Sequence, residues 1–183
     1  SNYIARLRKA LKDLGMEQIP VISFNMVGLE KNPGFKISVK MGKRLILGAL
    51  YGDLFQRLLY ATRPYEVEPG SAEAVMKKYE PQIFQNCKDG KVSTFKKLVP
   101  KIVADYDALP LKDVKKPKVG VVGEILVKYH PDANNNIVDI IEKEGGEAVV
   151  LDMIDFFLYG MYSKKFNYEK LSGSYKQYKI NKL

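Results

Sequence analysis

The stretch Lys118-Val119-Gly120-Val121-Val122-Gly123 decides the fold that this sequence predicts. Its run of valine and glycine is typical of a short buried strand. After a long polar connection over residues 124–136, the segment from Ile137 to Glu144 has the spacing of a helix, which Gly145-Gly146 ends. Residues Glu147 to Leu151 then predict a second strand. Two strands joined through a helix favour a parallel pairing, because parallel strands need a long crossover connection.

We therefore expect an α/β fold, with a Rossmann-like, partly parallel sheet flanked by helices and a helical N-terminal part. Residues 1–108 are predicted to form a mostly helical lobe with one or two strands. The proline-bounded residues 109–117 are the expected connector, and residues 118–183 carry the β-α-β unit. The chain has 183 residues, of which 46% are hydrophobic, and this suits one compact domain or one domain with a second, partial lobe.

The N-terminal lobe carries several patterns with helical spacing. A short strand is predicted at Ile19–Phe24, and Phe35–Val39 fits either a short exposed strand or the approach to the next helix. The expected helices run from Tyr3 to Leu14, from Arg44 to Thr62, from Ser71 to about Tyr79, and onward from a cap at Ser93. Pro81 is expected to bend or end the first of the last two helices, and Pro100 to kink the second or to start a new helix.

The helix over residues 44–62 has the clearest apolar face. Gly48 and Gly52 remove side chains from one strip of it at a cost in helix stability, so we expect a close backbone neighbour or a ligand along that strip. Asp53 and Arg57 are four residues apart and can pair across one turn. Arg63 ends the helix before Pro64, where it could bind an anion or pair with a carboxylate.

The connection between the two predicted strands is the candidate ligand-facing loop, since open parallel sheets bind ligands at the carboxyl ends of their strands. Glu124 follows the first strand, where a ligand-orienting carboxylate is often found; a solvated carboxylate is the alternative. The candidate cofactor-binding residues are Gly123, Glu124, His130, Asn134, Asn135 and Asn136.

None of these candidates forms a complete motif. Gly120 and Gly123 make only part of a dinucleotide fingerprint, because no third glycine opens the helix. The three asparagines before the helix could leave backbone N–H groups open to an anion, or one of them could simply cap the helix. His130 has no spacing partner for a Ser–His–Asp or Cys–His arrangement, which favours a structural role. We expect no catalytic residue.

The charge, the cysteine count and the apolar runs of the sequence limit the kinds of partner that we expect. The net charge is +9, from 30 Lys and Arg against 21 Asp and Glu. This charge suggests an anionic partner, but no basic stripe with interleaved aromatics indicates nucleic acid. The single cysteine, Cys87, is placed in a loop, and it excludes an internal disulfide and a multi-cysteine metal site. No apolar run approaches the ~20 residues that span a bilayer, so we expect a cytoplasmic protein without a membrane partner.

Three parts of the sequence together resemble one family, the large activase-type proteins related to 2-hydroxyacyl-CoA dehydratases, or CoA-substrate-specific enzyme activases. They are Ile19 to Asn25, Tyr51 to Glu66, and Val121 to Ile137 together with Asp155 to Tyr159. The resemblance implies stacked Rossmann-like domains, actin-like domains that hydrolyse ATP, and cysteine-held [4Fe–4S] clusters. It further implies ATP-driven single-electron transfer that prepares a dehydratase for radical chemistry.

The sequence also departs from that family. It contains no nucleotide-binding activator domain, and Cys87 alone cannot hold a cluster that needs several thiolates. We therefore expect a non-catalytic α/β part from inside a longer protein, with ATP and [4Fe–4S] belonging to the parent and no cofactor of its own. Its expected partners are the other domains of the parent chain and an acyl-CoA dehydratase. The alternatives are a small-molecule or nucleotide-binding module using the same loop, and a basic nucleic-acid-binding domain.

Overall fold

The computed structural model describes residues 2–21 and 38–175. The chain divides into two compact units, residues 1–38 and residues 39–183, and each is described by itself. The strand expected at Ile19–Phe24 and the segment Phe35–Val39 extend into residues outside the described ranges. Val39, the last residue of that segment, is the first residue of a helix.

The first unit contains helix α1, Asn2–Asp13, close to the bounds that the sequence predicts. The helix ends at Gly15, whose φ of +68° is left-handed and favours glycine. The N–H groups of Gly15 and Met16 bond to the carbonyls of Lys12 and Leu11, at 3.0 and 2.8 Å. The glycine therefore ends α1 by satisfying the carbonyls of its last turn.

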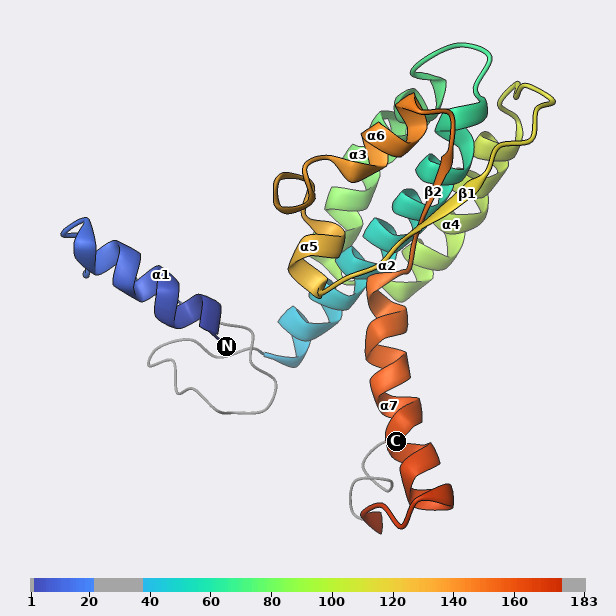
Figure 1. Ribbon diagram of the computed structural model, residues 1–183. Coiled ribbons are helices and arrows are strands. Elements are labelled where there is room, and N and C mark those ends of the chain that lie inside the picture. Colours follow the sequence, from blue (N-terminus) through green and yellow to red (C-terminus); the bar gives the residue numbers. More distant parts are fainter. Residues whose placement is uncertain (1, 22–37, 176–183) are drawn as a thin grey trace. The chain divides into compact units, whose positions relative to one another are not determined.

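The second unit is mostly helical, and a three-helix layer supplies its core. Figure 1 shows these helices packed together, with the two strands crossing one side of the layer. The helices are α2, Val39–Thr62; α3, Ser71–Asp89; and α4, Val92–Asp107. The buried core consists of Tyr51, Phe55, Ala72, Tyr79, Leu98, Ile102 and Tyr106. Burial of apolar surface is the main stabilising term of such a layer.

Helix α3 corrects the expectation of a short helix that ends near Tyr79 at Pro81. It continues through the proline to Asp89, and α4 likewise continues through Pro100. A buried contact explains part of this, because the hydroxyl of Tyr51 donates to Oδ1 of Asn86 at 2.8 Å. The side-chain amide of Asn86 donates in turn to the carbonyl of Lys91 at 2.9 Å. Tertiary contacts of this kind can offset the bond lost at a proline.

A carboxylate from outside the helix caps the start of α3. Oε2 of the buried Glu66 accepts hydrogen bonds from the hydroxyl of Ser71 at 2.8 Å and from the backbone N–H of Ala72 at 3.0 Å. Burial alone would raise the pKa of Glu66, but these donors and the neighbouring backbone N–H groups outweigh burial and lower it. Ser71, the first residue of the helix, therefore contributes to the cap as a donor to Glu66.

The two strands form a parallel pair, as the sequence predicts. Strand β1, Lys118–Val121, pairs with β2, Glu147–Val150, so that Val121 lies opposite Val150. The connection contains α5, Ile125–Tyr129; the 3₁₀ turn η2, Pro131–Asn134; and α6, Ile137–Lys143. The polar connection over residues 124–136, expected as a loop, therefore contains a short helix and a 3₁₀ turn. In the described part of the chain the sheet has these two strands, a βαβ unit rather than a full Rossmann-like sheet.

Arg63 fastens the βαβ unit to the helical layer. It lies in the 3₁₀ turn η1, Arg63–Tyr65, directly after α2. Its Nε and Nη2 donate to the two carboxylate oxygens of Glu142 at 2.7 and 3.0 Å, and Nη2 also donates to Asp139 at 3.0 Å. A planar guanidinium that bonds a carboxylate at two points is both strong and directional. Of the two roles that the sequence allowed for Arg63, the salt bridge is therefore the one observed.

Helix α7, Met153–Lys170, follows β2 directly and projects away from the three-helix layer (Figure 1). Among the described residues, no helix is long and apolar enough to cross a membrane.

The close backbone neighbour expected along the glycine strip of α2 is not found among the described residues. A Cβ added at Gly48 or at Gly52 would meet no described atom within 4 Å.

Candidate functional site

The carboxyl ends of β1 and β2 lie at one edge of the pair, as their parallel register requires. Gly123 follows β1 with a φ of +152°, a conformation that other residues rarely adopt. A Cβ at this position would make only ordinary contact with Val127, at 3.9 Å. Gly123 is thus required by the turn into α5, and not by the close approach of another backbone.

Glu124 and His130 bracket α5 and are both exposed. The carbonyl of Glu124 accepts the N–H of Lys128 at 2.8 Å, which begins the helix. The N–H of His130 bonds to the carbonyl of Leu126 at 3.0 Å, and the carbonyl of His130 accepts the N–H of Ala133 at 3.0 Å. The backbone of each residue therefore shapes the connection, while the side chains lie on its surface.

The three asparagines before α6 have separate places. Asn136 occupies the N-cap position of α6 without a side-chain cap bond. Oδ1 of Asn134, two residues earlier, accepts the N–H of Ile137, the first residue of α6, at 3.2 Å. Asn135 and Asn136 follow with φ values of +56° and +54°, and asparagine tolerates this left-handed conformation better than most residues. The asparagines thus turn the chain into α6, and Asn134 satisfies one N–H of its first turn.

Two charged residues of α2, Asp53 and Arg57, bond to the start of α7 at this edge, which the sequence did not indicate. Both oxygens of the buried Asp53 accept backbone N–H groups at the start of α7, from Met153 and Ile154, each at 2.8 Å. Arg57 bonds to Asp152 and lies 3.9 Å from Asp155. The expected pairing of Asp53 with Arg57 is therefore wrong, because both side chains reach α7. The sequence does place the carboxylate of Asp53 among the apolar residues of this helix, and a carboxylate buried there needs hydrogen-bond donors from elsewhere in the fold.

Asp152 is a further carboxylate of this network, and it pairs with Arg57. Its Oδ1 is buried and has no hydrogen-bond partner among the described residues. Burial raises the pKa of Asp152; Arg57 opposes this shift, and the nearby Asp53 and Asp155 add to it. Two further bonds tie the same edge together: Tyr129 donates to the carbonyl of Leu151 at 2.7 Å, and Gln56 donates to that of Val150 at 3.4 Å. The edge therefore joins α2, β2, α5 and α7.

The raised pKa of Asp152 predicts how stability changes with pH. A carboxyl whose pKa is higher in the folded protein than in the unfolded chain favours folding while it is protonated, and that contribution is lost as the pH rises. We expect the free energy of unfolding of the wild type, relative to Asp152→Asn, to fall as the pH rises from about 3.9, the ordinary aspartate value. Urea titrations at several pH values measure this difference; an increase with pH would mean that the contact with Arg57 outweighs burial.

Cys87 lies within α3, so its expected placement in a loop is wrong. The side chain is half-buried and packs against the helical core, and burial raises the pKa of its thiol. Thiolate is the form that binds metals. Among the described residues, no group of three or more His, Cys, Asp and Glu side chains is placed to hold a metal ion.

The opposite, amino edge of the strand pair carries a second polar group that sequence reasoning missed. There the buried Glu147 accepts a hydrogen bond from the Tyr65 hydroxyl at 2.7 Å and forms an ion pair with Lys118 at 3.0 Å. An open hollow beside them is also lined by Lys115 and Lys116. Glu147 is thus satisfied by its neighbours, and the group mainly ties η1 to the beginnings of both strands.

No model of a known protein family, no characterised protein and no solved structure matches this chain. The likeness to the activase-type proteins therefore depends on the three sequence stretches alone.

Proposed function

We propose that this chain is a non-catalytic α/β scaffold belonging to a protein related to the activators of 2-hydroxyacyl-CoA dehydratases. The observation that carries the proposal is the use of charged groups at the carboxyl edge. Asp53 caps α7 through two bonds of 2.8 Å, and Arg57 pairs with Asp152. Side chains that could have served a ligand at this edge are thereby engaged in joining secondary-structure elements.

In this proposal the energy-coupling chemistry lies in other domains of the protein. ATP hydrolysis and a [4Fe–4S] cluster would be supplied there, and an acyl-CoA dehydratase would receive the electron. The present chain would contribute a Rossmann-like βαβ unit clamped to a helical layer by Arg63. Such a unit can hold neighbouring domains in register without binding a cofactor of its own.

Turnover and ligand binding test the proposal directly. Incubated with a 2-hydroxyacyl-CoA thioester, the chain alone should form no enoyl-CoA product, while a complete dehydratase system run in parallel supplies the positive control. Calorimetric titrations with CoA, an acyl-CoA and ATP should give no saturable heat. Unaided turnover would overturn the scaffold assignment. Micromolar binding that Glu124→Gln weakens would instead establish the small-molecule module.

The nucleic-acid alternative has its own signature. Binding through phosphate contacts weakens steeply as salt is added, because condensed counterions are released. Fluorescence anisotropy with labelled single and double strands at low and high salt checks it. We expect no binding at physiological salt; tight, salt-sensitive binding would favour the nucleic-acid-binding domain over the scaffold.

The state of Cys87 gives a further prediction. Its half-buried position in α3 and its raised pKa disfavour the thiolate form that a cluster needs. Protein purified under anaerobic conditions should therefore be colourless and hold no iron, as visible absorbance and metal analysis will show. Stoichiometric iron with iron–sulfur absorbance would contradict this account of Cys87.

A further inference from the structure

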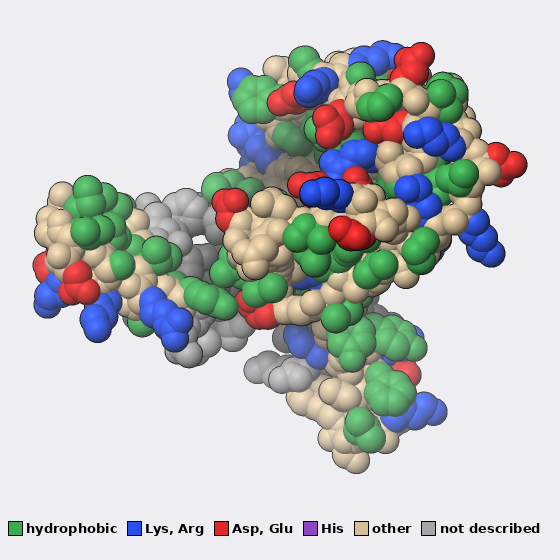
Figure 2. Space-filling view, turned by 45° about the horizontal axis from the view of Figure 1, so that its top comes forward, with side chains coloured by type: hydrophobic (Ala, Val, Ile, Leu, Met, Phe, Trp, Pro, Cys, Tyr) green, Lys and Arg blue, Asp and Glu red, His purple; other side chains and the backbone are tan. Residues whose placement is uncertain are grey.

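Helix α7 exposes large apolar side chains along most of its length, as Figure 2 shows on the projecting part of the molecule. No described residue of the helix is buried. The exposed residues are Met153, Phe156, Phe157, Leu158, Tyr159, Met161, Tyr162, Phe166 and Tyr168. Contiguous apolar surface of this kind marks an interaction site on a folded protein.

The order of these residues shows how such a helix must be covered. Residues 156–159 are consecutive and are 48–71% exposed. Because consecutive helical residues point about 100° apart, as 3.6 residues complete one turn, these four side chains cover every side of the helix. A helix that is apolar all round is normally enclosed. A single flat surface would therefore leave part of α7 exposed.

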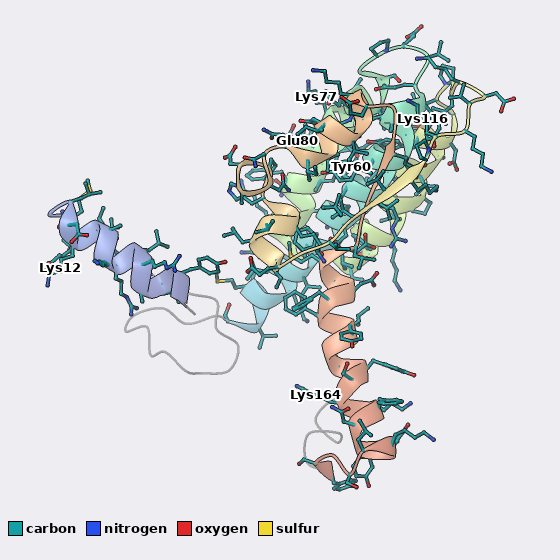
Figure 3. All side chains as sticks on the ribbon, viewed as in Figure 1. Lys12, Tyr60, Lys77, Glu80, Lys116 and Lys164 are labelled. Carbon is teal, nitrogen blue, oxygen red and sulfur yellow. The ribbon has the colours of Figure 1, made fainter. Side chains whose placement is uncertain are left out.

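The outer half of α7 adds charge to this apolar surface. This half contains only one carboxylate, Glu169, and three lysines: Lys164, Lys165 and Lys170. Figure 3 shows Lys164 pointing away from the helix axis. An occupant that packs along the apolar part would meet these lysines, so it should carry carboxylates beside its own apolar side chains.

The crossover connection, defined as residues 122–146, has this combination. It carries five carboxylates and two lysines in a chain whose net charge is +9. Asp139 and Glu142 pair with Arg63 of the same chain, so Asp132 and Glu144 are the exposed carboxylates on which the contact depends. The crossover also exposes apolar side chains, each at least 41% accessible: Val122, Ile125, Leu126, Val127 and Ile140. The crossover is thus an acidic and apolar surface on an otherwise basic protein.

We propose that a second copy of this chain covers α7, with the α7 of each copy lying against the crossover connection of the other. The charge complementarity of the two surfaces supports a second copy as the occupant. A two-fold axis would make this contact twice, which helps the pair approach the roughly 800 Å² per partner that stable complexes bury. The proposal goes beyond the scaffold function and does not depend on it.

Analytical ultracentrifugation of the full chain tests the pairing. We expect a dimer with a micromolar dissociation constant, weakened at least about tenfold by reversing two charges on α7, Lys164→Glu with Lys165→Glu. The matched control is Lys96→Glu with Lys97→Glu, which reverses two adjacent, exposed lysines on α4. It makes the same change in net charge and should leave the dimer intact.

A charge exchange makes the test specific. Asp132→Lys with Glu144→Lys, two exposed residues of the crossover, should weaken the dimer alone and restore it when combined with the α7 reversal. Circular dichroism checks that each variant is folded. A monomer at about 100 μM, equal weakening by the α4 control, or a failure of the combined variant to recover would each overturn the proposal. None of these outcomes bears on ligand binding or iron, so the scaffold function is tested separately.

Discussion

Replacing Asp53 with alanine should destabilise the protein by about 2 kcal/mol, the upper range for the loss of a helix cap. Its two oxygens accept the N–H groups of Met153 and Ile154 at 2.8 Å, and both donors lie at a partly buried junction. Without Asp53 these two N–H groups would stay buried with no acceptor, so the folded state would lose the hydrogen bonds and would also carry the full cost of desolvating the donors. Urea unfolding measures the change, and hydrogen exchange should show the first turn of α7 opening more readily.

Asp53→Asn is the matched control, because asparagine caps helices about as well as aspartate. It keeps one acceptor oxygen in place and also removes a negative charge near Asp152. We expect it to cost less than half as much as Asp53→Ala. Equal losses in the two variants would show that the charge of Asp53, rather than its acceptor atoms, stabilises the junction.

Truncation of Ile102 to alanine should have the largest effect of any single change considered, about 3 kcal/mol of unfolding free energy. The Ile102 side chain on α4 is fully buried at the centre of the helical core. Its removal loses transfer free energy and leaves a cavity that the surrounding helices can fill only in part. Thermal and urea unfolding should both register the loss.

The control for Ile102 is Val92→Ala at the start of the same helix. Val92 is 52% exposed, so its truncation removes little buried surface and should change stability by less than about 0.5 kcal/mol. Comparable losses at the two positions would mean that the helical layer is not the centre of stability of this unit.

The local elements of the second unit could largely be predicted from the sequence. Valine and glycine between residues 118 and 123, and the Gly145-Gly146 stop, indicated two strands and the helix between them, and the structure contains the parallel pair. The continuation of α3 and α4 through their prolines could not be predicted, because tertiary contacts that the sequence does not show can offset the hydrogen bond lost at a proline. Asn86, for example, accepts from Tyr51 beyond Pro81.

The candidate site was predictable in place but not in its residues. The sequence indicated the carboxyl edge of the strands and a capping role for one of the asparagines. Asn134 does bond to the first N–H of α6, but from two residues before the N-cap position. The sequence did not indicate that Asp53 and Arg57 reach this edge, about a hundred residues along the chain from their partners. Spacing along one helix made their mutual pairing the simplest expectation.

The sequence by itself determined the overall charge, which is a sum over all residues. It also determined most of the individual helices and the two strands, because their patterns depend on residues close together along the chain. Only the tertiary structure decided which charged groups meet: Arg63 with Glu142, Glu66 with the start of α3, and Asp53 with the start of α7. The physical reason is that a buried or half-buried charge takes whichever donor or acceptor the packing brings within reach, and packing joins segments that are far apart in sequence.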